Sequence, residues 1–282
     1  MFQLSLLEKE ISVENKKLVS VIITTYNRAL LLQRCLDSVL AQNYKNLEII
    51  VADDCSTDNT NEIVKKYQKK DSRIKYFKHN KNKGNAYTRN TAFRNCKGFY
   101  VAFLDDDDQW IDKNKIRNQV NIYKKTDDIK LGIVCSGIIR IKRDGKKIKE
   151  KAIKPKNLKY KVLKGGLIHN STVLTKRKII KQVGKFNLKI SRGVDSEFFR
   201  RLIVIYNFNV FFMKDITVKY YENSKNRMSS LETCVEIGKH IEAQVFNIKV
   251  YFKFLLTKPS ILIFRILMII KLFLKYLKCK LV

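Results

Sequence analysis

The sequence predicts an α/β fold with an open, mostly parallel sheet. Strand and helix patterns alternate through the first hundred residues, which is typical of parallel strands joined by helices. Residues 19–24 (VSVIIT) and 47–51 (LEIIV) are largely β-branched and apolar, as expected of strands buried on both faces. Because ligands of such sheets bind beyond the carboxyl ends of the strands, we expect the functional residues there.

Apolar spacing predicts the elements between and after these strands. Side chains of residues 30–40 recur at helical spacing, and Ser56, Thr57 and Asp58 form an expected N-cap cluster for a helix that runs through Tyr67. Residues 73–77 predict a third strand, residues 85–93 a helix, and residues 100–104 a fourth strand.

The pattern changes after residue 130. Residues 132–141 and 147–153 flank Asp144 and Gly145, a pair that favours a hairpin turn. We expect helices over residues 175–182 and 195–206, a strand over residues 208–213, and helix from residue 231 onward. The chain then divides into an N-terminal extension (1–17), a domain in two parts (18–125 and 126–230) and a helical tail (231–282).

The charge balance is strongly basic. Lys and Arg number 58 against 26 Asp and Glu, a formal net charge of +32, which favours phosphorylated substrates, anionic lipid or nucleic acid as partners. The lysines are spread from Lys9 to Lys280, so a Lys-, Asn- and Ile-rich composition inherited from an AT-rich genome explains the charge equally well. Charge alone therefore identifies no function.

The six cysteines include no C-x-x-C pair, and with three histidines they do not support a zinc site. The first residues are too acidic, and too short in their apolar stretch, for a secretory signal. Scattered cysteines in such a chain predict reduced thiols and a cytoplasmic location.

Carboxylates follow two of the predicted strands. Asp53 and Asp54 come after the second strand, and Asp105, Asp106, Asp107 and Asp108 come after the fourth. Four adjacent carboxylates repel one another, and a bound divalent cation removes that repulsion; a solvated acidic turn is the alternative. No G-x-G-x-x-G follows the first strand, which disfavours a dehydrogenase.

Four motifs in order, VSVIITTYNR, VADDCSTD, NKGNAYTRN and FLDDDDQW, resemble the N-terminal half of the family 2 inverting glycosyltransferases. The resemblance covers residues 18–125 and, more loosely, residues 165–230. It implies a GT-A-like fold in which residues 18–125 bind the nucleotide sugar and residues 126–230 form the acceptor side, with a nucleotide-sugar donor, UDP-linked, as substrate.

The resemblance also implies roles for single residues. Tyr26 would stack on the base, Asp54 would accept hydrogen bonds from it, and Asp105 would face the ribose or sugar. Asp107, with Asp105, would hold a Mn²⁺ or Mg²⁺ ion that bridges the diphosphate. The expected nucleotide-sugar site comprises Thr24, Tyr26, Asn27, Asp53, Asp54, Gly84, Arg89, Asp105, Asp106 and Arg227.

The segment RGVDSEFFRRL supplies a candidate general base. Asp195 matches the family's catalytic Asp and Arg201 its Arg, whereas Val194 stands where the family often has Glu. Glu197 is the local competitor for the base, and a helix N-cap is the structural alternative for Asp195. His169 and Asn170 lie in the segment that resembles the acceptor side, although a structural role is the stronger expectation for His169.

Residues 245–282 are apolar and basic. Between Lys258 and Lys271 there are 12 positions, interrupted by Arg265, which is too few for a spanning helix. A helix that lies in the interface of an anionic membrane fits better, and a core-packing or dimerising helix is the alternative. A membrane contact would favour a lipid-linked or other glycan acceptor and a peripheral location on the inner face of the cell membrane.

The sequence thus predicts an inverting, metal-dependent glycosyltransferase of bacterial surface polysaccharide or glycan assembly, with no nucleic-acid partner. The alternatives are a nucleic-acid-binding protein, a catalytically inactive relative that binds nucleotide, and a nucleotidyltransferase. The first would leave the Asp105–Asp108 run unexplained and would bind in a strongly salt-dependent way.

Overall fold

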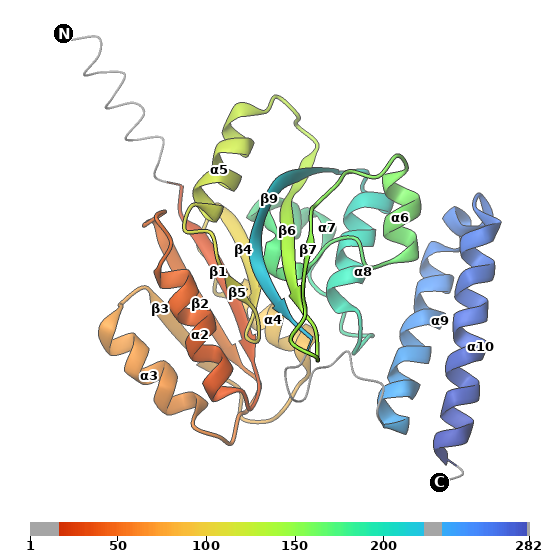
Figure 1. Cartoon of the computed structure of the whole chain (residues 1–282), viewed down its shortest axis with the longest axis horizontal. Helices are drawn as coiled ribbons and strands as arrows, with labels where there is room; N and C mark the ends of the chain where they lie inside the picture. Colours follow the sequence, from red (N-terminus) through yellow and green to blue (C-terminus); the bar gives the residue numbers. More distant parts are fainter. Residues whose placement is uncertain (1–16, 223–232, 281–282) are drawn as a thin grey trace.

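The computed structural model describes residues 17–222 and 233–280. These ranges contain a nine-stranded sheet with the order β3-β2-β1-β4-β8-β6-β9-β5, and β7 pairs with β6 at the side (Figure 1). The strands are β1 (Val19–Thr25), β2 (Leu47–Asp53), β3 (Ile74–Lys78), β4 (Tyr100–Asp105), β5 (Gln109–Trp110), β6 (Leu131–Ile141), β7 (Lys147–Glu150), β8 (Leu174–Lys176) and β9 (Asn209–Tyr221).

The strands β1 to β4 pair in parallel, as predicted, and β6 pairs in parallel with β9. β1 pairs in parallel with β2 and β4, and β2 pairs in parallel with β3. Side chains of β1 alternate between two apolar cores: Val21 and Ile23 pack on one face of the sheet and Ile22 on the other. Burial on both faces is the reason that β1 and β2 are almost uninterrupted apolar runs.

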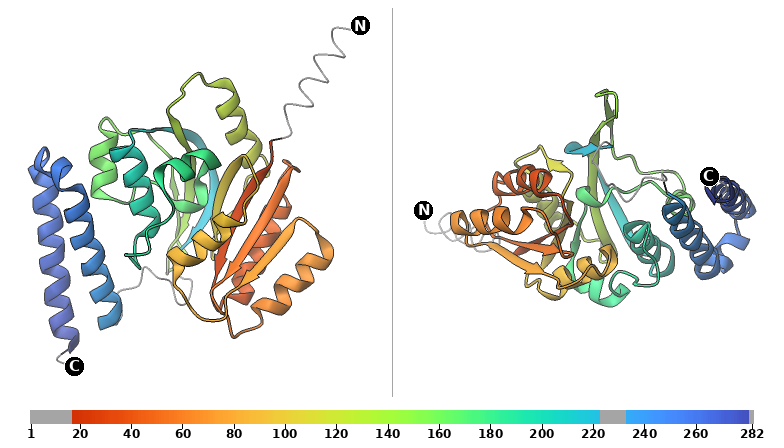
Figure 2. Two further views of the ribbon diagram at one scale, coloured as in Figure 1. Left: turned by 180° about the vertical axis from the view of Figure 1, so that it is seen from behind. Right: turned by 90° about the horizontal axis from the view of Figure 1, so that it is seen from below.

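Helices cover both faces of the sheet. The first core takes side chains from α2 (Ala29–Leu40), α3 (Thr60–Lys70) and α5 (Lys115–Lys125). The second takes them from α4 (Asn85–Arg94), α6 (Leu158–Lys164), α7 (Arg177–Val183) and α8 (Val194–Arg200). Figure 2 shows this arrangement from behind and from below. The predicted α/β fold is confirmed.

Three predicted elements differ in the structure. The helix expected over residues 195–206 is α-helical from Val194 to Arg200 and continues as a π-helix from Arg201 to Ile205. Residues 175 and 176, expected in a helix, belong to β8, and the helix begins at Arg177, because Thr175 pairs with both β4 and β6. The predicted strand over residues 208–213 extends to Tyr221, because β9 pairs along most of β6 and then with β5. The predicted hairpin of β6 and β7 is confirmed, with Gly145 at φ +80° in its turn.

The predicted N-cap cluster before α3 needs a smaller correction. The N-cap position is Asn59, whose side chain makes no capping bond. Asp58 does accept a hydrogen bond from the Thr60 N–H at 3.1 Å, and its other oxygen accepts one from the Ala29 N–H at 3.0 Å. Asp58 therefore joins the starts of α3 and α2.

The tail forms a helical hairpin rather than one helix. α9 (Cys234–Leu256) and α10 (Pro259–Lys280) run side by side, with α9 nearer to α8 and α10 outermost (Figures 1 and 2). Pro259, which cannot continue the preceding helix, stands at the first position of α10. Within the two described ranges, no helix has both the length and the apolar character that crossing a bilayer requires.

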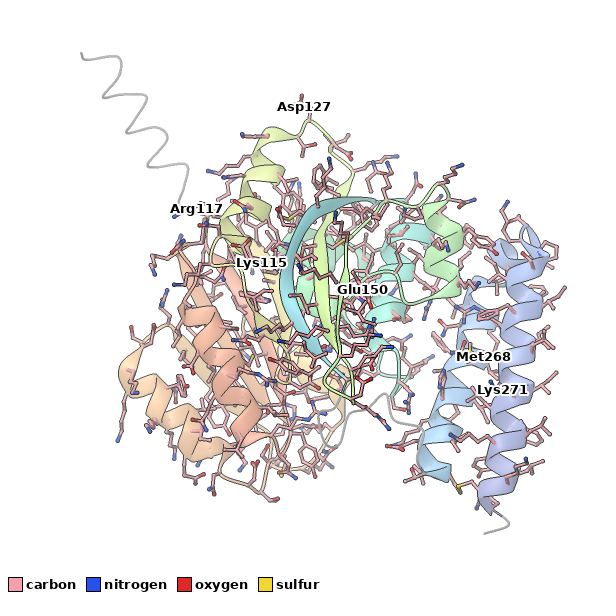
Figure 3. All side chains as sticks on the ribbon, viewed as in Figure 1. Lys115, Arg117, Asp127, Glu150, Met268 and Lys271 are labelled. Carbon is pink, nitrogen blue, oxygen red and sulfur yellow. A yellow bond between two sulfur atoms is a disulfide. The ribbon has the colours of Figure 1, made fainter. Side chains whose placement is uncertain are left out.

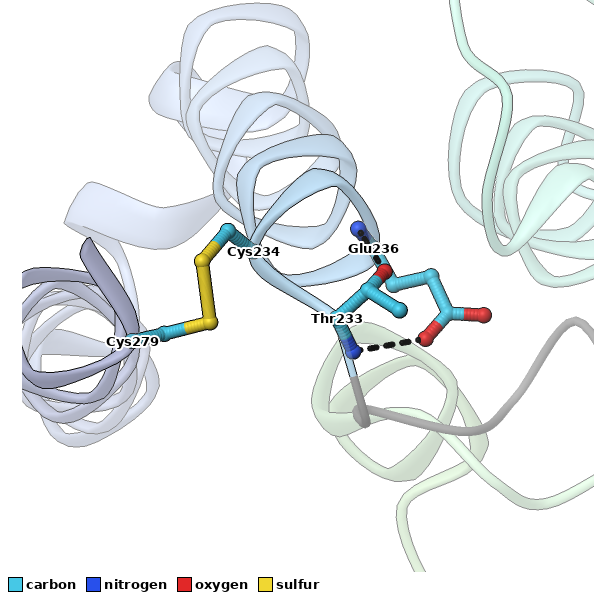
Figure 4. The surroundings of a disulfide bond; sticks show 4 residues. All are labelled: Thr233, Cys234, Glu236 and Cys279. Atoms are coloured by element: carbon cyan, nitrogen blue, oxygen red, sulfur yellow. Dashed lines mark hydrogen bonds between the residues drawn. A yellow bond between two sulfur atoms is a disulfide. The ribbon is translucent and has the colours of Figure 1, made fainter. Parts of the chain in front are cut away.

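A disulfide joins Cys234, at the start of α9, to Cys279, near the end of α10 (Figure 4). The expectation of reduced thiols is therefore wrong for this pair, whereas Cys35, Cys55, Cys96 and Cys135 are free. The two cysteines are separated by 45 residues, and only the antiparallel pairing of α9 and α10 brings their Cα atoms to 5.7 Å.

A buried carboxylate, Glu48, joins the amino-terminal ends of neighbouring strands. Glu48 is 4% exposed, and its Oε1 accepts hydrogen bonds from the Ser20 hydroxyl at 2.6 Å and from the N–H groups of Lys97 and Gly98. Its Oε2 accepts one from Lys75 Nζ at 2.6 Å. Burial raises the pKa of Glu48, but these bonds outweigh burial, so that its pKa lies below the ordinary 4.5.

We therefore expect Glu48→Gln to lower the free energy of unfolding at neutral pH by about 1–3 kcal/mol, because charge-assisted hydrogen bonds to buried groups are lost. A carboxylate whose folded pKa is depressed stabilises the fold above its unfolded pKa, and loses that effect as pH falls through the folded pKa. The deficit of the variant should thus narrow below about pH 4.5.

Denaturant unfolding of both proteins across acidic and neutral pH measures this difference. Glu242→Gln, at an exposed position of α9, is the matched control and should unfold like the wild type. If the loss of unfolding free energy in Glu48→Gln does not change with pH, the charge of Glu48 does not stabilise the fold.

Candidate active site

The carboxyl ends of β1, β2 and β4 meet at one edge of the sheet. Their register places Thr24 opposite Asp105 on one side and Thr25 opposite Asp53 on the other. The residues expected around a nucleotide sugar therefore come together from segments that lie far apart in the sequence. Sequence periodicity alone predicts this convergence, because parallel strands end at the same edge.

At the end of β2, both aspartates are buried and hold loops. Asp53 accepts hydrogen bonds from the N–H and hydroxyl of Ser56 at 2.8 and 2.6 Å and from the Tyr76 hydroxyl. Burial, together with this bond to Asp53, raises the pKa of Tyr76. Asp53 thus fixes the turn after β2.

Asp54 fixes the loop that leads into α4. Its two oxygens accept hydrogen bonds from the N–H groups of Lys83 and Gly84, each at 2.8 Å, and one of them lies 3.0 Å from His79 Nδ1. Gly84 has φ +83°, a conformation that favours glycine. The structure thus brings together Asp54 and Gly84, two of the expected site residues.

The loop after β1 contacts the same region. Asn27, at φ +52°, accepts a hydrogen bond from the Thr57 N–H at 2.7 Å, and its own N–H donates to the Ser56 hydroxyl. Tyr26 is 45% exposed, so a face of its ring is accessible to a ligand. The position of Tyr26 fits the predicted stacking role, which stays a prediction.

Asp105 lies at the centre of a polar network. Its Oδ1 accepts hydrogen bonds from Arg89 Nη2 at 2.7 Å and from Asn170 Nδ2 at 2.8 Å. Arg89 also donates a hydrogen bond to Asn85 Oδ1 at 3.0 Å. The Thr24 hydroxyl donates a weaker bond, at 3.5 Å, to this Asn85 oxygen. Asn170, expected on the acceptor side, thus contacts the strand end that carries the acidic loop.

Arg28 pairs with the middle of the acidic loop, which we define as Asp105–Asp108. Its Nη1 lies 2.8 Å from Asp106 Oδ1 and 3.2 Å from Asp107 Oδ2. Burial and the neighbouring Asp107 raise the pKa of Asp106 to about 6, although Arg28 opposes this. Burial lowers the pKa of Arg28, but Asp106 and Asp107 outweigh it and raise that pKa overall.

The loop is also tied to its surroundings by neutral groups. Ser171 donates to Asp108 Oδ2 at 2.6 Å, and its carbonyl accepts the Trp110 indole N–H at 2.8 Å. Lys115 lies beside Trp110, with Nζ 4.3 Å from the ring centroid, and burial lowers its pKa to about 7 (Figure 3). The contacts of Arg28 and Ser171 with this loop were not predicted from the sequence, because they depend on the fold.

The donor set fits a cation that arrives with a phosphate ligand. In the described ranges, no three His, Cys, Asp or Glu residues are grouped so that they could hold a metal alone. Mg²⁺ is commonly held through one or two carboxylates together with substrate phosphates. Asp105, whose side chain is 28% exposed, and Asp107 can supply these carboxylates. Asp106, Asp107 and Asp108 are all buried. Asp107 is held less closely by Arg28, at 3.2 Å, than Asp106 is, at 2.8 Å, and Asp108 is bonded to Ser171.

α8 carries the two candidate bases, and they differ in their surroundings. Glu197 is 1% exposed and accepts two hydrogen bonds from Arg201, at 3.0 and 2.9 Å. Asp195 is partly exposed in the first turn, where the helix dipole favours a carboxylate. Because the N-cap position belongs to Gly193, the N-cap alternative for Asp195 is wrong. Glu197 is committed to Arg201, which leaves Asp195 as the accessible carboxylate of the pair.

A shallow, open hollow lies against one side of α8. It is lined by residues of α6, of α8 and of the segment between α6 and Asn170, namely Val162, Gly165, Gly166, Leu167, Ile168, Ser196 and Phe199. The segment expected on the acceptor side thus borders the helix that carries the candidate base. Within the described residues, Asp195 makes no hydrogen bond to the acidic loop.

Three other expectations have mixed outcomes. His169 packs edge-on against Tyr220, with ring centroids 5.0 Å apart, and its Nε2 lies 3.9 Å from Glu150, a residue of β7 that Figure 3 labels. This environment fits the structural role expected for His169. Val194, where the family often has Glu, is 2% exposed and packs in the second core. Arg227 lies outside the described residues.

Comparison with known proteins identifies relatives. The model of a family described as "Glycosyl transferase family 2" matches residues 20–184. The UDP-Glc:α-D-GlcNAc-diphosphoundecaprenol β-1,3-glucosyltransferase WfaP of Escherichia coli is 49% identical over 105 residues, 37% of this chain and 41% of that protein. The putative teichuronic acid biosynthesis glycosyltransferase TuaG of Bacillus subtilis is 34% identical over 62% of this chain and 68% of its own.

An uncharacterized glycosyltransferase of Methanocaldococcus jannaschii, MJ1057, is 31% identical over 84% of this chain and 86% of its own. This chain therefore matches less than half of the E. coli relative but most of the archaeal one.

Solved structures share the fold. Staphylococcus aureus TarS (residues 1–349) in complex with UDP-GlcNAc has a TM-score of 0.63 at 21% identity, over 83% of this chain and 72% of that one. The mannosyltransferase PcManGT of Pyrobaculum calidifontis, in complex with GDP-Man and Mn²⁺, has a TM-score of 0.62 at 21% identity, over 82% and 64%. The GT-A-like α/β fold expected from the sequence is confirmed.

The environments of the two carboxylates on α8 predict that amide substitution destabilises the fold strongly at Glu197 and little at Asp195. Glu197→Gln should lower the free energy of unfolding on the order of 3 kcal/mol, because Arg201 keeps its charge in a largely buried site. Asp195→Asn should change it by less than about 0.5 kcal/mol, because Asp195 has no such partner in the described part of the chain.

Thermal and denaturant unfolding of the two variants beside the wild type measures both effects. Equal destabilisation by the two substitutions would contradict the assignment of Glu197 as the structural carboxylate.

Proposed function

This chain belongs to glycosyl transferase family 2, and from that premise we propose that it transfers a sugar from a UDP-linked donor to an acceptor hydroxyl, with inversion at the anomeric carbon. The observation that carries the proposal is the convergence of Asp105, Asp107 and two arginines at the edge where β1, β2 and β4 end. Arg28 and Arg89 provide guanidinium groups, which recognise phosphate oxygens in a planar, bidentate manner.

In the proposed reaction, Asp195 removes the proton from the acceptor hydroxyl as its oxygen attacks the anomeric carbon. The bond from that carbon to the phosphate oxygen breaks, and the nucleoside diphosphate leaves with the electron pair. A single displacement inverts the configuration. Two observations support this role for Asp195: its side chain is partly exposed, and it is not held in an ion pair as Glu197 is. The helix that carries Asp195 also borders the acceptor-side segment through Ser196 and Phe199.

Negative charge develops on the leaving diphosphate, and the site is arranged to stabilise it. A Mn²⁺ or Mg²⁺ ion bound with the donor would act as a Lewis acid on that diphosphate. Asp105 and Asp107 would hold the ion. Arg89, bonded to Asp105 at 2.7 Å, orients that carboxylate, and Arg28 is positioned to compensate charge within the loop.

The relatives suggest the class of donor and acceptor. WfaP is named for a UDP-glucose donor and a diphosphoundecaprenol-linked GlcNAc acceptor, and a Campylobacter jejuni relative for a glucosyl transfer to a lipid-linked oligosaccharide. By analogy, we propose a UDP-hexose donor and a lipid-linked glycan acceptor in surface polysaccharide assembly. The enzyme would then work in the cytoplasm at the inner face of the membrane.

The inactive-relative alternative rests on Val194, and donor hydrolysis distinguishes it from the proposed function. Val194 stands where the family often has Glu, but its side chain is buried among apolar residues of the second core. The side chain of Val194 therefore contacts the core of the domain.

The test is slow hydrolysis of UDP-, GDP- and TDP-sugars, with Mn²⁺ and with chelator. We expect one donor class to be hydrolysed only with metal. Asp107→Ala and Asp195→Ala should each lower the rate at least about 100-fold, because each removes a group that acts in the displacement. UDP binding should survive in Asp195→Ala and weaken in Asp107→Ala.

Asp144→Ala, at an exposed position in the β6–β7 turn, is the matched control and should keep wild-type activity. The proposal would be refuted by a chain that hydrolyses no nucleotide sugar and instead binds nucleic acid in a salt-sensitive way.

A further inference from the structure

The helical hairpin carries most of the exposed apolar surface. Of the 22 large apolar side chains exposed in the described part of the chain, 13 lie on α9 and α10. Seven of those on α10 are spaced by one or three residues and form one stripe, which we call the outer face: Ile263, Ile266, Leu267, Ile270, Phe273, Leu274 and Leu277. An exposed apolar stripe of this extent indicates a contact surface.

Arg265 interrupts the apolar run in the sequence, but it does not interrupt the outer face. It is 2% exposed and points inward with Ile261 and Leu272. Its Nη1 donates to Gln244 Oε1 of α9 at 2.6 Å, and its Nη2 donates to the carbonyl of Leu163 on α6. The charge within the apolar run therefore holds α10 against the domain and leaves the opposite side apolar.

The hairpin is basic as well as apolar. Glu242 is the last acidic residue of the sequence, and residues 243–282 contain seven lysines and Arg265. Lys271, Lys275 and Lys278 recur at helical spacing beside the outer face and are exposed; Figure 3 labels Lys271 on the outermost helix. An apolar stripe with lysines on its flank, and no carboxylate, is typical of helices that lie in the headgroup region of anionic bilayers.

We propose that the outer face of α10 docks on an anionic lipid bilayer, with its apolar residues at the acyl boundary and Lys271, Lys275 and Lys278 at the phosphate headgroups. The idea that this bilayer also carries a lipid-linked acceptor rests on the proposed function. The docking itself rests on the composition and exposure of α10. With 22 residues, α10 is about 33 Å long, but it is not apolar enough to cross a bilayer, so we place it along the surface.

The charge pattern favours lipid over a second copy of the chain. In a symmetric dimer through the outer face, the lysines of one copy would face those of the other, and residues 243–282 of neither copy contain a carboxylate to compensate them. A nucleic acid would be attracted by the lysines but would leave the apolar stripe in water.

The side of the hairpin opposite the outer face is attached to α8, the helix that carries Asp195. Tyr251 of α9 is 1% exposed, and its hydroxyl lies 3.3 Å from the Glu197 carbonyl on α8, two residues from Asp195. The Cys234–Cys279 disulfide joins the two helices at the end opposite Pro259 (Figure 4). Docking through α10 would therefore hold α8, and Asp195 with it, at a set height above the bilayer.

Sedimentation with vesicles tests the proposal on the full chain. We expect binding to phosphatidylcholine vesicles only when they contain phosphatidylglycerol. Leu267→Glu combined with Leu274→Glu should weaken binding about tenfold or more, because two charges enter the outer face. Replacing Lys271, Lys275 and Lys278 by Gln should remove the preference for phosphatidylglycerol and the salt dependence of binding.

The matched control is Ile129→Glu combined with Leu188→Glu, which makes the same charge change at side chains that are 90% and 61% exposed elsewhere. It should bind like the wild type, and circular dichroism should show all variants folded. Wild-type binding by the Leu267/Leu274 variant, or binding that ignores lipid charge, overturns the proposal. The proposal is also overturned if the wild type is a dimer in the absence of vesicles and the Leu267/Leu274 variant is a monomer. A second copy of the chain would then cover the outer face.

Donor hydrolysis without vesicles separates this proposal from the proposed function. The Leu267/Leu274 variant should hydrolyse donor like the wild type. If no protein hydrolyses donor while vesicle binding follows the expected pattern, the proposed function fails and the docking surface stands. If the wild type hydrolyses donor but vesicle binding does not follow the expected pattern, only the docking surface is rejected.

Discussion

Repulsion among four successive carboxylates at the end of β4 is the constraint on which the arrangement of the site depends. Like charges a few ångströms apart in a buried turn are unfavourable unless cations or donors approach them. The partners come from separate segments: Arg28 follows β1, Arg89 belongs to α4, and Asn170 and Ser171 belong to the turn before β8. Satisfying the acidic loop thus brings the two parts of the domain together at the place where the site is expected.

Buried polar contacts likewise make the C-terminal hairpin part of the folded unit. Leu163 of α6 and Val204, which follows α8, share an apolar cluster with Tyr251, Leu255 and Ile261. Tyr251 and Arg265 then satisfy carbonyl groups on α8 and α6. A segment that looks like an appendage in sequence therefore braces the helix with the candidate base, and its outward side is left for another contact.

The sequence predicted what local patterns encode and missed what distant pairing decides. β1, β2, β4 and α4 were predicted correctly because β-branched runs and helical spacing are local signals. Thr175 was assigned to a helix because its pairing with β4 and β6 is not local. The ion pair between Glu197 and Arg201 was not predicted, although the spacing of four residues between these two side chains was a visible hint. No sequence signal indicated that Arg28 would contact a loop 78 residues away.

The most direct test of the acidic loop as the diphosphate site is a crystal structure of the protein with UDP and Mn²⁺. Our account predicts that the uracil ring lies on Tyr26, and that Mn²⁺ contacts Asp107 and diphosphate oxygens. Arg28, now 3.2 Å from Asp107, should then lie beyond hydrogen-bond distance of that carboxylate. A nucleotide bound away from the ends of β1, β2 and β4, or an Asp107 still paired with Arg28 and without the ion, would contradict the account.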